Sequence, residues 1–248
     1  MSIYQTFTQA KTDRKTLFVV LIDPDHVNIG NLDEVAQTAI DAQVDAFFIG
    51  GSLIVNNQMD KVITQLKAAS GIPTILFPGG SLQLSYRADA LLLLSLISGR
   101  NPDLLIGKHV EVAPFLRMSP LEILSTGYML IDGGVATSVS YMSNTYPIPA
   151  SKNDIAVCTA IAGEMLGMKL IFMDAGSGAR NPVSVEMIEA VSSNIAIPLI
   201  VGGGISTPEK VYANAAAGAD VIVVGNAIEK NPSLIKELAA AAHGFVAV

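Results

Sequence analysis

The stretch KLIFMDAGSGARNPVSVEMIEAVSSN, residues 169–194, contains a strand-like run, a loop and a helical segment in that order. After its lysine the run KLIFM (169–173) is wholly apolar, which is typical of a parallel strand buried on both faces. The small-residue loop DAGSGAR (174–180) leads to PVSVEMIEAVSSN (182–194), whose apolar residues recur with the period of a helix. This order predicts one repeat unit of an α/β fold.

Similar units recur along the whole chain. Further strand-like runs are LFVVLI (17–22), VDAFFI (44–49), PTILF (73–77), ALLLL (90–94), YMLI (128–131), IPLIV (197–201) and DVIVV (220–224). Helical segments are LDEVAQTAIDAQ (32–43), KVITQLKAAS (61–70), NDIAVCTAIAGEMLG (153–167) and PEKVYANAAAG (208–218). Eight strands with crossover helices favour a closed (β/α)8 barrel, the TIM barrel, and leave an open doubly wound sheet as the alternative.

One unit is irregular. Only PGGSLQLSYRAD (78–89) separates the third strand-like run from the fourth. This segment of 12 residues has scarcely room for a full helix. We therefore expect the third helix of the barrel to be shortened or missing. No linker or charge block divides the chain, which predicts a single domain over residues 1–248.

Composition excludes several classes of protein. A net charge of −7 argues against a nucleic-acid binder, and no run reaches the roughly 18 to 20 apolar residues of a membrane span. The single cysteine, Cys158, and the absence of an apolar leader fit a cytoplasmic protein. Cys158 stands in an apolar helical segment, which predicts a position in the core. Half of the residues are apolar, and this fraction favours a homo-oligomer with buried subunit contacts.

Small-residue loops follow three consecutive strands: DAGSGAR (174–180), GGGIST (202–207) and GNAIEKN (225–231). Glycine lets backbone N–H groups approach a phosphate closely, and the helices that follow add positive dipole ends. Tight turns explain any one such loop, but three at one end of a barrel predict a phosphate site. The predicted substrate-binding residues are Ala175, Gly176, Ser177, Gly178, Gly203, Gly204, Gly225 and Asn226.

Asp174 stands between a strand and this predicted phosphate site. Its carboxylate could accept a proton from a substrate hydroxyl as a general base, or it could bond the loop backbone. Phe172 lies two residues earlier and therefore points to the same side of the strand. We include Phe172 and Asp174 among the substrate-binding residues, with Asp174 as the catalytic one.

Acids and a hydroxyl follow the first two strands. Asp23 and Asp25 stand in LIDPDH (21–26), and Ser52 ends FIGGS (48–52). Mg²⁺ is typically held by one or two carboxylates together with substrate phosphate oxygens, and Asp23, Ser52 and Asp25 are the candidate ligands. Asp23 is closer to the strand end, whereas Asp25 could equally cap the next segment. His26 has no second histidine or cysteine at the spacing of a transition-metal site.

The chain resembles the geranylgeranylglyceryl phosphate synthase family, including its bacterial heptaprenylglyceryl phosphate synthase relatives. The strongest segment is YPIPASKNDIAVCTAIAGEMLGMKLIFMDAGSGA (146–179), and FIGGS, GRNP (99–102) and PLIVGGGI (198–205) also match. The resemblance implies a Mg²⁺-dependent prenyltransferase. Its substrates would be a long-chain prenyl diphosphate, geranylgeranyl diphosphate first among them, and the sn-3 hydroxyl of sn-glycerol 1-phosphate. It also implies a barrel without its third helix.

Two positions depart from the family pattern. The family commonly has Tyr-x-Glu before AGSG, where this chain has Phe172 and Asp174. The phenol is therefore absent at Phe172, and the carboxylate is one methylene shorter. Bacterial relatives also carry a lysine two residues before the metal-binding aspartate, where Leu21 stands here.

The implied substrates require further binding surfaces. Arg100, Lys108 and Arg180 are candidate partners of the diphosphate. Apolar surface for the prenyl tail is offered by the fourth strand, by VEVAPFL (110–116) and by the loop 133–149, although a core role explains these residues equally. The lipid product implies transient contact with a membrane. Rival functions are another phosphate-binding barrel enzyme, an isomerase or a thiamine-phosphate-type synthase, and a phosphate-ligand sensor without catalysis.

Overall fold

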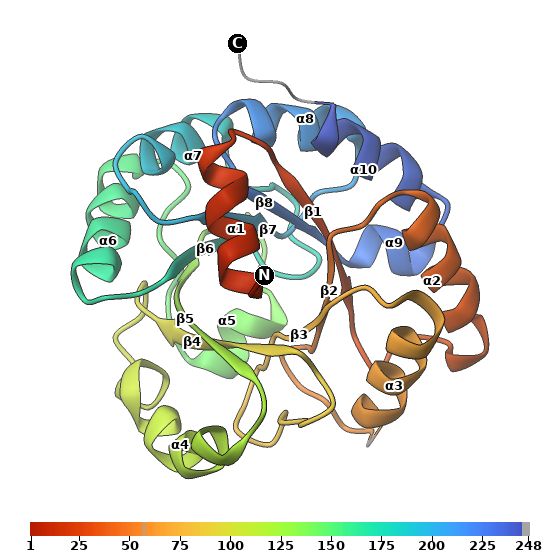
Figure 1. Ribbon diagram of the computed structural model, residues 1–248. Helices are drawn as coiled ribbons and strands as arrows, with labels where there is room; N and C mark the ends of the chain where they lie inside the picture. The colour runs from red at the N-terminus through yellow and green to blue at the C-terminus, as the bar shows by residue number, and fades with distance from the viewer. Residues whose placement is uncertain (57, 245–248) are drawn as a thin grey trace.

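The computed structural model describes residues 1–56 and 58–244, and these residues form a closed barrel of eight parallel strands (Figure 1). The strands are β1 (Leu17–Ile22), β2 (Ala46–Ile49), β3 (Thr74–Leu76), β4 (Ala90–Leu96), β5 (Glu122–Leu130), β6 (Leu170–Asp174), β7 (Leu199–Gly202) and β8 (Val221–Val224). They pair in chain order, and β8 pairs with β1. The predicted TIM barrel is confirmed, and the open doubly wound sheet is excluded.

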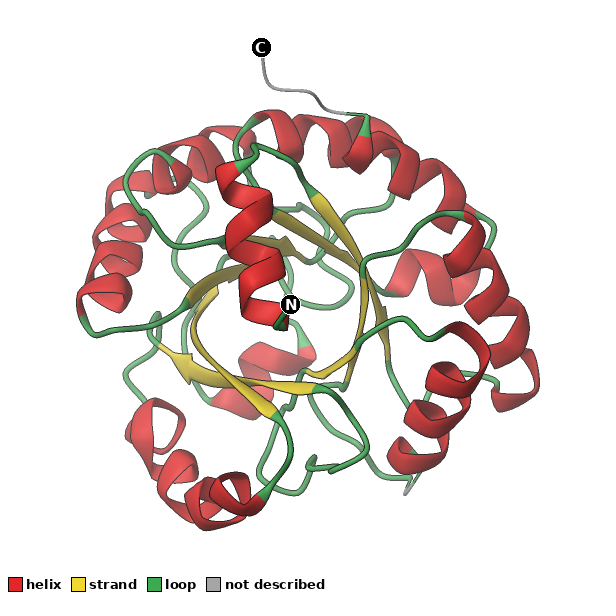
Figure 2. Ribbon diagram, in the orientation of Figure 1, coloured by secondary structure: helices red, strands yellow, loops and turns green. Residues whose placement is uncertain are grey.

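Helices accompany the strands, most of them on the outside of the ring and α1 across one end of it (Figure 2). They are α1 (Ile3–Thr12), α2 (Leu32–Asp41), α3 (Met59–Ser70), α4 (Lys108–Met118), α5 (Ser138–Ser143), α6 (Asn153–Met165), α7 (Val185–Ser192), α8 (Pro208–Ala216), α9 (Asn226–Lys230) and α10 (Leu234–His243). A 3-10 turn, η1 (Ile29–Asn31), precedes α2, and a π-helical turn, η2 (Asp103–Gly107), precedes α4.

Helix α1 covers the N-terminal end of the barrel, which faces the viewer in Figure 1. Its Phe7 packs with the residues of the barrel interior. The Glu122 carboxylate, at the start of β5, accepts the N–H groups of Ile3 at 2.7 Å and Tyr4 at 3.0 Å. A carboxylate at a helix N-terminus satisfies free donors and complements the helix dipole. The barrel is therefore closed at this end, and its open end is the C-terminal one.

The third crossover has no helix. Residues 77–89, all of which the structure describes, form a loop between β3 and β4. On the other side of β4, η2 and α4 occupy the next crossover. Leu91 and Leu93 of β4 belong to the layer between strands and helices, and both line a cavity. The expected loss of the third helix is confirmed, because a loop takes its place between β3 and β4.

Residues of each strand alternate between two apolar layers. On β6, Phe172 belongs to the barrel interior, whereas Ile171 and Met173 pack in the layer between the barrel and its helices. This alternation is the two-residue period of a strand. It places Asp174, two residues beyond Phe172, on the inward side.

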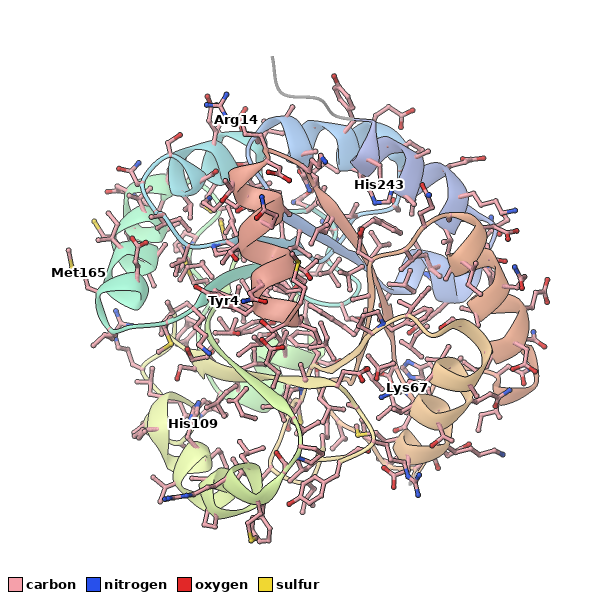
Figure 3. All side chains as sticks on the ribbon, viewed as in Figure 1. Tyr4, Arg14, Lys67, His109, Met165 and His243 are labelled. Carbon is pink, nitrogen blue, oxygen red and sulfur yellow. The ribbon has the colours of Figure 1, made fainter. Side chains whose placement is uncertain are left out.

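Two expectations were wrong. Strand β5 begins at Glu122 rather than Tyr128, because EILSTG (122–127) mixes polar and apolar residues yet pairs with β4 over its whole length. Cys158 is exposed rather than buried, because the outward face of α6 is itself apolar. Met165, 82% exposed, lies on this face and projects from the edge of the molecule (Figure 3).

Candidate active site

A cavity of about 680 Å³ opens at the C-terminal ends of the strands. Residues that follow β1, β2, β3, β6, β7 and β8 line it, and so do parts of β4, α4 and α5. In a TIM barrel this end carries the active site because the strand-to-helix loops converge there. The cavity is the candidate active site.

Glycine loops form one side of the cavity. Gly176, Gly178, Gly203 and Gly204 have φ values of 87°, 75°, 83° and 71°, a backbone region that other residues rarely adopt. Across the loops, the Ser177 hydroxyl donates to Asn226 Oδ1 at 2.8 Å. We call the cavity-lining set Ser177, Gly178, Gly203, Gly204, Gly225 and Asn226 the glycine cradle. These predicted residues are brought together.

Two predicted substrate-binding residues support the loop instead of lining the cavity. Ala175 is buried, and its N–H donates to the Gly202 carbonyl at 3.2 Å. Gly176 donates its N–H to Asp174 Oδ1 at 2.7 Å. Their backbone donors are thus used within the protein, and the cradle begins at Ser177.

Asp174 is 8% exposed, and its carboxylate lines the cavity. Its Oδ1 accepts the Gly176 N–H, and its Oδ2 accepts the Tyr128 hydroxyl at 2.6 Å. Burial raises the pKa of Asp174, and the hydrogen bonds from Tyr128 and Gly176 oppose that shift. Asp174 therefore holds the loop backbone and also faces the space where a substrate would bind. Its role as a base stays a prediction.

The structure separates the two acids after β1. Asp23 lines the cavity with Ser52, and a Cβ atom added to Gly51 would lie 2.5 Å from Asp23 Oδ2, so the carboxylate lies against the loop that carries Ser52. Burial raises the pKa of Asp23, opposed by the Asp25 N–H and by His26, whose Nδ1 lies 3.5 Å from Oδ2.

Asp25, by contrast, accepts the N–H groups of Val55 at 2.6 Å and Asn56 at 2.9 Å. Both of its oxygens serve the loop after β2, and Asp25 does not line the cavity. Among the described residues no three acidic, histidine or cysteine side chains come together as a metal cluster. A cation at Asp23 would therefore depend on Ser52 and on substrate oxygens for its remaining ligands.

The basic residues predicted to contact the diphosphate also fall into two groups, those that line the cavity and those that do not. Lys108 lines the cavity, although its Nζ also pairs with Glu111 Oε1 at 3.0 Å. Arg100 and Arg180 do not line it, and Arg100 donates to the Gly99 carbonyl at 2.8 Å. Lys230, at the end of α9, does line the cavity and was not predicted.

Sequence reasoning also missed Glu229 and Tyr128. Both line the cavity, and burial together with the nearby Asp23 raises the pKa of Glu229. Glu229 stands in GNAIEKN, a segment we considered only for Gly225 and Asn226. Tyr128 lies in the apolar run YMLI, where an aromatic residue is most simply explained as core. The two-residue period of β5 was the one available signal that Tyr128 points inward.

An apolar groove continues from the cradle between β4 and α4. Leu91, Leu93, Leu104, Val112 and Leu116 line it, and Val139 and Met142 of α5 add to the same cavity. All three segments that the sequence offered as tail-binding surface contribute to this groove. His109, labelled on α4 in Figure 3, also lines it and bonds Ser95 Oγ at 3.2 Å.

The fold and the site define a (β/α)8-barrel enzyme in which the glycine cradle and an apolar groove belong to one cavity. Residues 9–242 match the model of the PcrB family. The chain belongs to this family.

Relatives support the assignment over the whole length. The geranylgeranylglyceryl phosphate synthase of Chitinophaga pinensis is 56% identical, covering 99% of this chain and 98% of the relative. That of Thermococcus kodakarensis is 40% identical, covering 94% and 92%.

Solved structures agree with this. (S)-3-O-geranylgeranylglyceryl phosphate synthase from Thermoplasma acidophilum, in complex with substrate sn-glycerol-1-phosphate, superposes with a TM-score of 0.93 at 29% identity, covering 99% of this chain and 100% of that one. Thiamine phosphate pyrophosphorylase from Pyrococcus furiosus, with a TM-score of 0.55 at 15% identity and coverages of 94% and 97%, shares the fold alone.

Proposed function

We propose that this chain forms an ether bond between a long-chain prenyl diphosphate and the sn-3 hydroxyl of sn-glycerol 1-phosphate, with release of diphosphate. The observation that carries the proposal is the continuity of one cavity. A glycine cradle suited to a phosphate and a groove lined by leucine and valine open into the same space, and Asp174 lies beside the cradle. The names of the relatives make geranylgeranyl diphosphate the donor that we favour.

In this reaction the glycerol phosphate binds with its phosphate on the glycine cradle and its far hydroxyl toward Asp174. The hydroxyl oxygen forms a bond to C1 of the prenyl chain, the bond from C1 to the diphosphate oxygen breaks, and Asp174 accepts the hydroxyl proton. Positioned proton transfer of this kind typically contributes about 10²- to 10⁴-fold to rate. Diphosphate leaves with the bonding electron pair.

Asp23 and Ser52 fit the Mg²⁺ that the family resemblance implies. Carboxylate and hydroxyl lie on neighbouring loops of the cavity, which suits a hard cation completed by phosphate oxygens. Bound there, Mg²⁺ would act as a Lewis acid that stabilises the negative charge of the departing diphosphate. Lys108 and Lys230 are the cavity-lining lysines that would add positive charge.

The prenyl tail would occupy the groove between β4 and α4, and its product would leave toward a lipid phase. In the part of the chain that the structure describes, no helix has the length and apolar character to cross a bilayer. We therefore propose a cytoplasmic enzyme that contacts a membrane transiently. The rival functions, another phosphate-binding barrel enzyme or a sensor, give no reason for a long apolar groove beside the cradle.

The outward face of α6 supports a homo-oligomer. Ile155, Cys158, Ala162 and Met165 follow one another at intervals of three or four residues, and all are exposed. An exposed row of apolar residues on a helix marks a surface that another molecule can cover. We propose that a second copy of the chain covers this face, which we call the α6 stripe.

The test is a direct assay with radiolabelled sn-glycerol 1-phosphate, Mg²⁺ and prenyl diphosphates of increasing length. We expect label to enter an organic-extractable product only when a long-chain donor is present. Reactions with glycerol in place of its phosphate serve as the control. Absence of extractable product with every donor would contradict the proposed function.

A further inference from the structure

Tyr128 reaches the site from a strand that the reaction above does not use. It lies on β5 in register with Phe172 of β6, and its side chain belongs to the barrel interior. Its hydroxyl donates to Asp174 Oδ2 at 2.6 Å. We propose that Tyr128 is a positioning residue for prenyl transfer, holding the Asp174 carboxylate toward the substrate hydroxyl, an inference that rests on the base role proposed above.

The Asp174 carboxylate is held at both oxygens by donors from different elements. Gly176 N–H binds Oδ1 at 2.7 Å and Tyr128 O–H binds Oδ2 at 2.6 Å. Two such bonds fix the plane of the carboxylate, which one bond alone would leave free to rotate. Each oxygen of an ionised carboxylate can accept a second hydrogen bond, so the substrate hydroxyl still finds an acceptor.

The tyrosine ring is itself fixed by aromatic neighbours. Its centroid lies 5.5 Å from that of Phe172 in an edge-to-face arrangement, and 6.0 Å from that of Phe77. Phe172 in turn stacks on Phe77 at 5.1 Å. Neither phenylalanine carries a hydroxyl, so within this cluster Tyr128 alone can donate to Asp174. The packing sets the direction of that donor.

Tyr128 remains a donor over any practical assay range, because burial and the Asp174 charge hold the pKa of its phenol well above 10. From β7, Asp174 faces Gly202 and Gly203, and from its own loop Gly176, so within the described residues Tyr128 is its titratable neighbour. Among the residues that the structure describes, no lysine, arginine or histidine opposes the burial that raises the pKa of Asp174. The Tyr128 bond thus favours the ionised base as well as orienting it.

The test is Tyr128→Phe in the full-length enzyme, assayed for ether formation. We expect kcat to fall by about 10- to 100-fold, the usual scale for a misplaced catalytic group, with KM for glycerol phosphate changed less than about twofold. Loss of a donor to the charged form should raise the pKa of Asp174. The acid limb of the kcat/KM profile should therefore move to higher pH.

Phe48→Leu is the matched control. Phe48 belongs to the same aromatic cluster, 6.4 Å from Phe172 and 6.1 Å from Phe77 between centroids, but it does not line the cavity. It should lower Tm and leave the acid limb unmoved. An unchanged acid limb and kcat in Tyr128→Phe, or an equal shift in Phe48→Leu, would overturn the proposal.

A double variant separates action through Asp174 from any other effect. In the Asp174→Asn background, Tyr128→Phe should cost little further kcat, because the group it positions no longer accepts a proton. Full additivity of the two losses would assign Tyr128 a role independent of Asp174 and overturn the inference. A wild-type enzyme without ether product would instead contradict the proposed function.

Discussion

Asp174 combines two tasks in one side chain. Its Oδ1 closes the turn at Gly176, and its Oδ2 binds Tyr128, while the carboxylate still lines the cavity. The alternatives that the sequence left open, loop support or chemistry, are therefore not exclusive in geometry. At the residue scale, a conservative substitution of Asp174 can separate its support of the loop from its part in the chemistry.

We expect Asp174→Asn to lose chemistry far more than binding. Asparagine keeps an oxygen for the Gly176 N–H but cannot accept a proton, so kcat should fall by about 10²- to 10⁴-fold while the Kd for glycerol phosphate changes little. Measuring kcat and Kd on the same preparation checks this. A near-normal kcat with weakened binding would assign Asp174 to the loop alone.

The same variant has an expected pH signature in stability. Burial raises the pKa of Asp174 in the folded state, so the folded protein binds this proton more tightly than the unfolded chain does. Ionisation therefore costs stability as pH rises from the unfolded pKa through the folded one. Asp174→Asn should equal or exceed the wild type in Tm at neutral pH, and lose that advantage in acid. Thermal melts at several pH values measure this difference in Tm. A Tm of Asp174→Asn below that of the wild type at neutral pH would contradict the expectation.

The Mg²⁺ requirement can be tested separately at the two neighbouring acids, Asp23 and Asp25. Chelation should abolish turnover and Mg²⁺ should restore it, and Asp23→Asn should raise the Mg²⁺ concentration needed for half-maximal rate. Asp25→Asn is the control, because its oxygens bond Val55 and Asn56. It should lower Tm and leave the Mg²⁺ requirement unchanged. Full activity of Asp23→Asn in metal-free buffer would contradict the assignment.

At the scale of elements, most of the candidate site is formed by the loops that follow the strands. Most strands are predictable because burial on both faces makes them nearly continuous apolar runs. The first part of β5 was not predictable, because its polar residues interrupt the apolar run that is typical of a buried strand. The π-helical turn that precedes α4 was not predicted either. Tyr128 escaped prediction for another reason. It is 46 residues from Asp174 along the chain, and only the register of β5 and β6 brings the two together.

Gly203→Ala should damage the site more than its backbone strain explains. Gly203 has φ 83°, and an added Cβ would lie 2.5 Å from Asp174 Oδ1. Gly167 offers a matched control with φ 85° and open space around its Cβ. Gly167→Ala should lose about 1–2 kcal/mol of unfolding free energy from the left-handed backbone. Gly203→Ala should lose more, because its Cβ would also lie 2.6 Å from Gly176 N and 2.7 Å from Ala175 N. Only Gly203→Ala should lower kcat/KM, and equal kinetics in the two variants would refute this.

Met165→Glu should disrupt self-association. It places a charge within the α6 stripe, where burial of an unpaired carboxylate is costly. Light scattering coupled to gel filtration should give a multiple of 25.9 kDa for the wild type and a smaller mass for the variant. Ile40→Glu, at a 39% exposed apolar residue of α2, should leave the mass unchanged. A monomeric wild type would remove the basis for this expectation.

At the scale of the whole molecule, closure of the barrel places the ends of distant strands around one space. The parallel order was predictable from the alternating pattern, but the distances from the cradle to Asp174 and Asp23 arise only when the ring closes. Which charges reach that space, Lys230 rather than Arg180, likewise depends on closure. Sequence reasoning identified the loops, and the barrel determined which of their side chains face inward.

Closure of the barrel also predicts a preference for one enantiomer of glycerol phosphate. In the proposed complex the cradle would fix the phosphate at one point and Asp174 the hydroxyl at another, so one enantiomer of glycerol phosphate should present its far hydroxyl correctly. We expect kcat/KM to favour sn-glycerol 1-phosphate over the 3-phosphate. Parallel assays of the two pure enantiomers measure the ratio. Equal values would refute the two-point arrangement.

Because a loop replaces the helix between β3 and β4, a bound substrate can contribute to the packing of the protein. Elsewhere in the barrel a helix covers the outer side of the strands, but beside β3 and β4 a loop stands in its place. Leu91 and Leu93 line the cavity beside this crossover and belong to an apolar surface that a hydrocarbon chain can cover. In the proposed complex an isoprenoid would supply apolar contacts of the kind that a helix makes elsewhere in the ring, so the ligand would also complete the packing of the barrel.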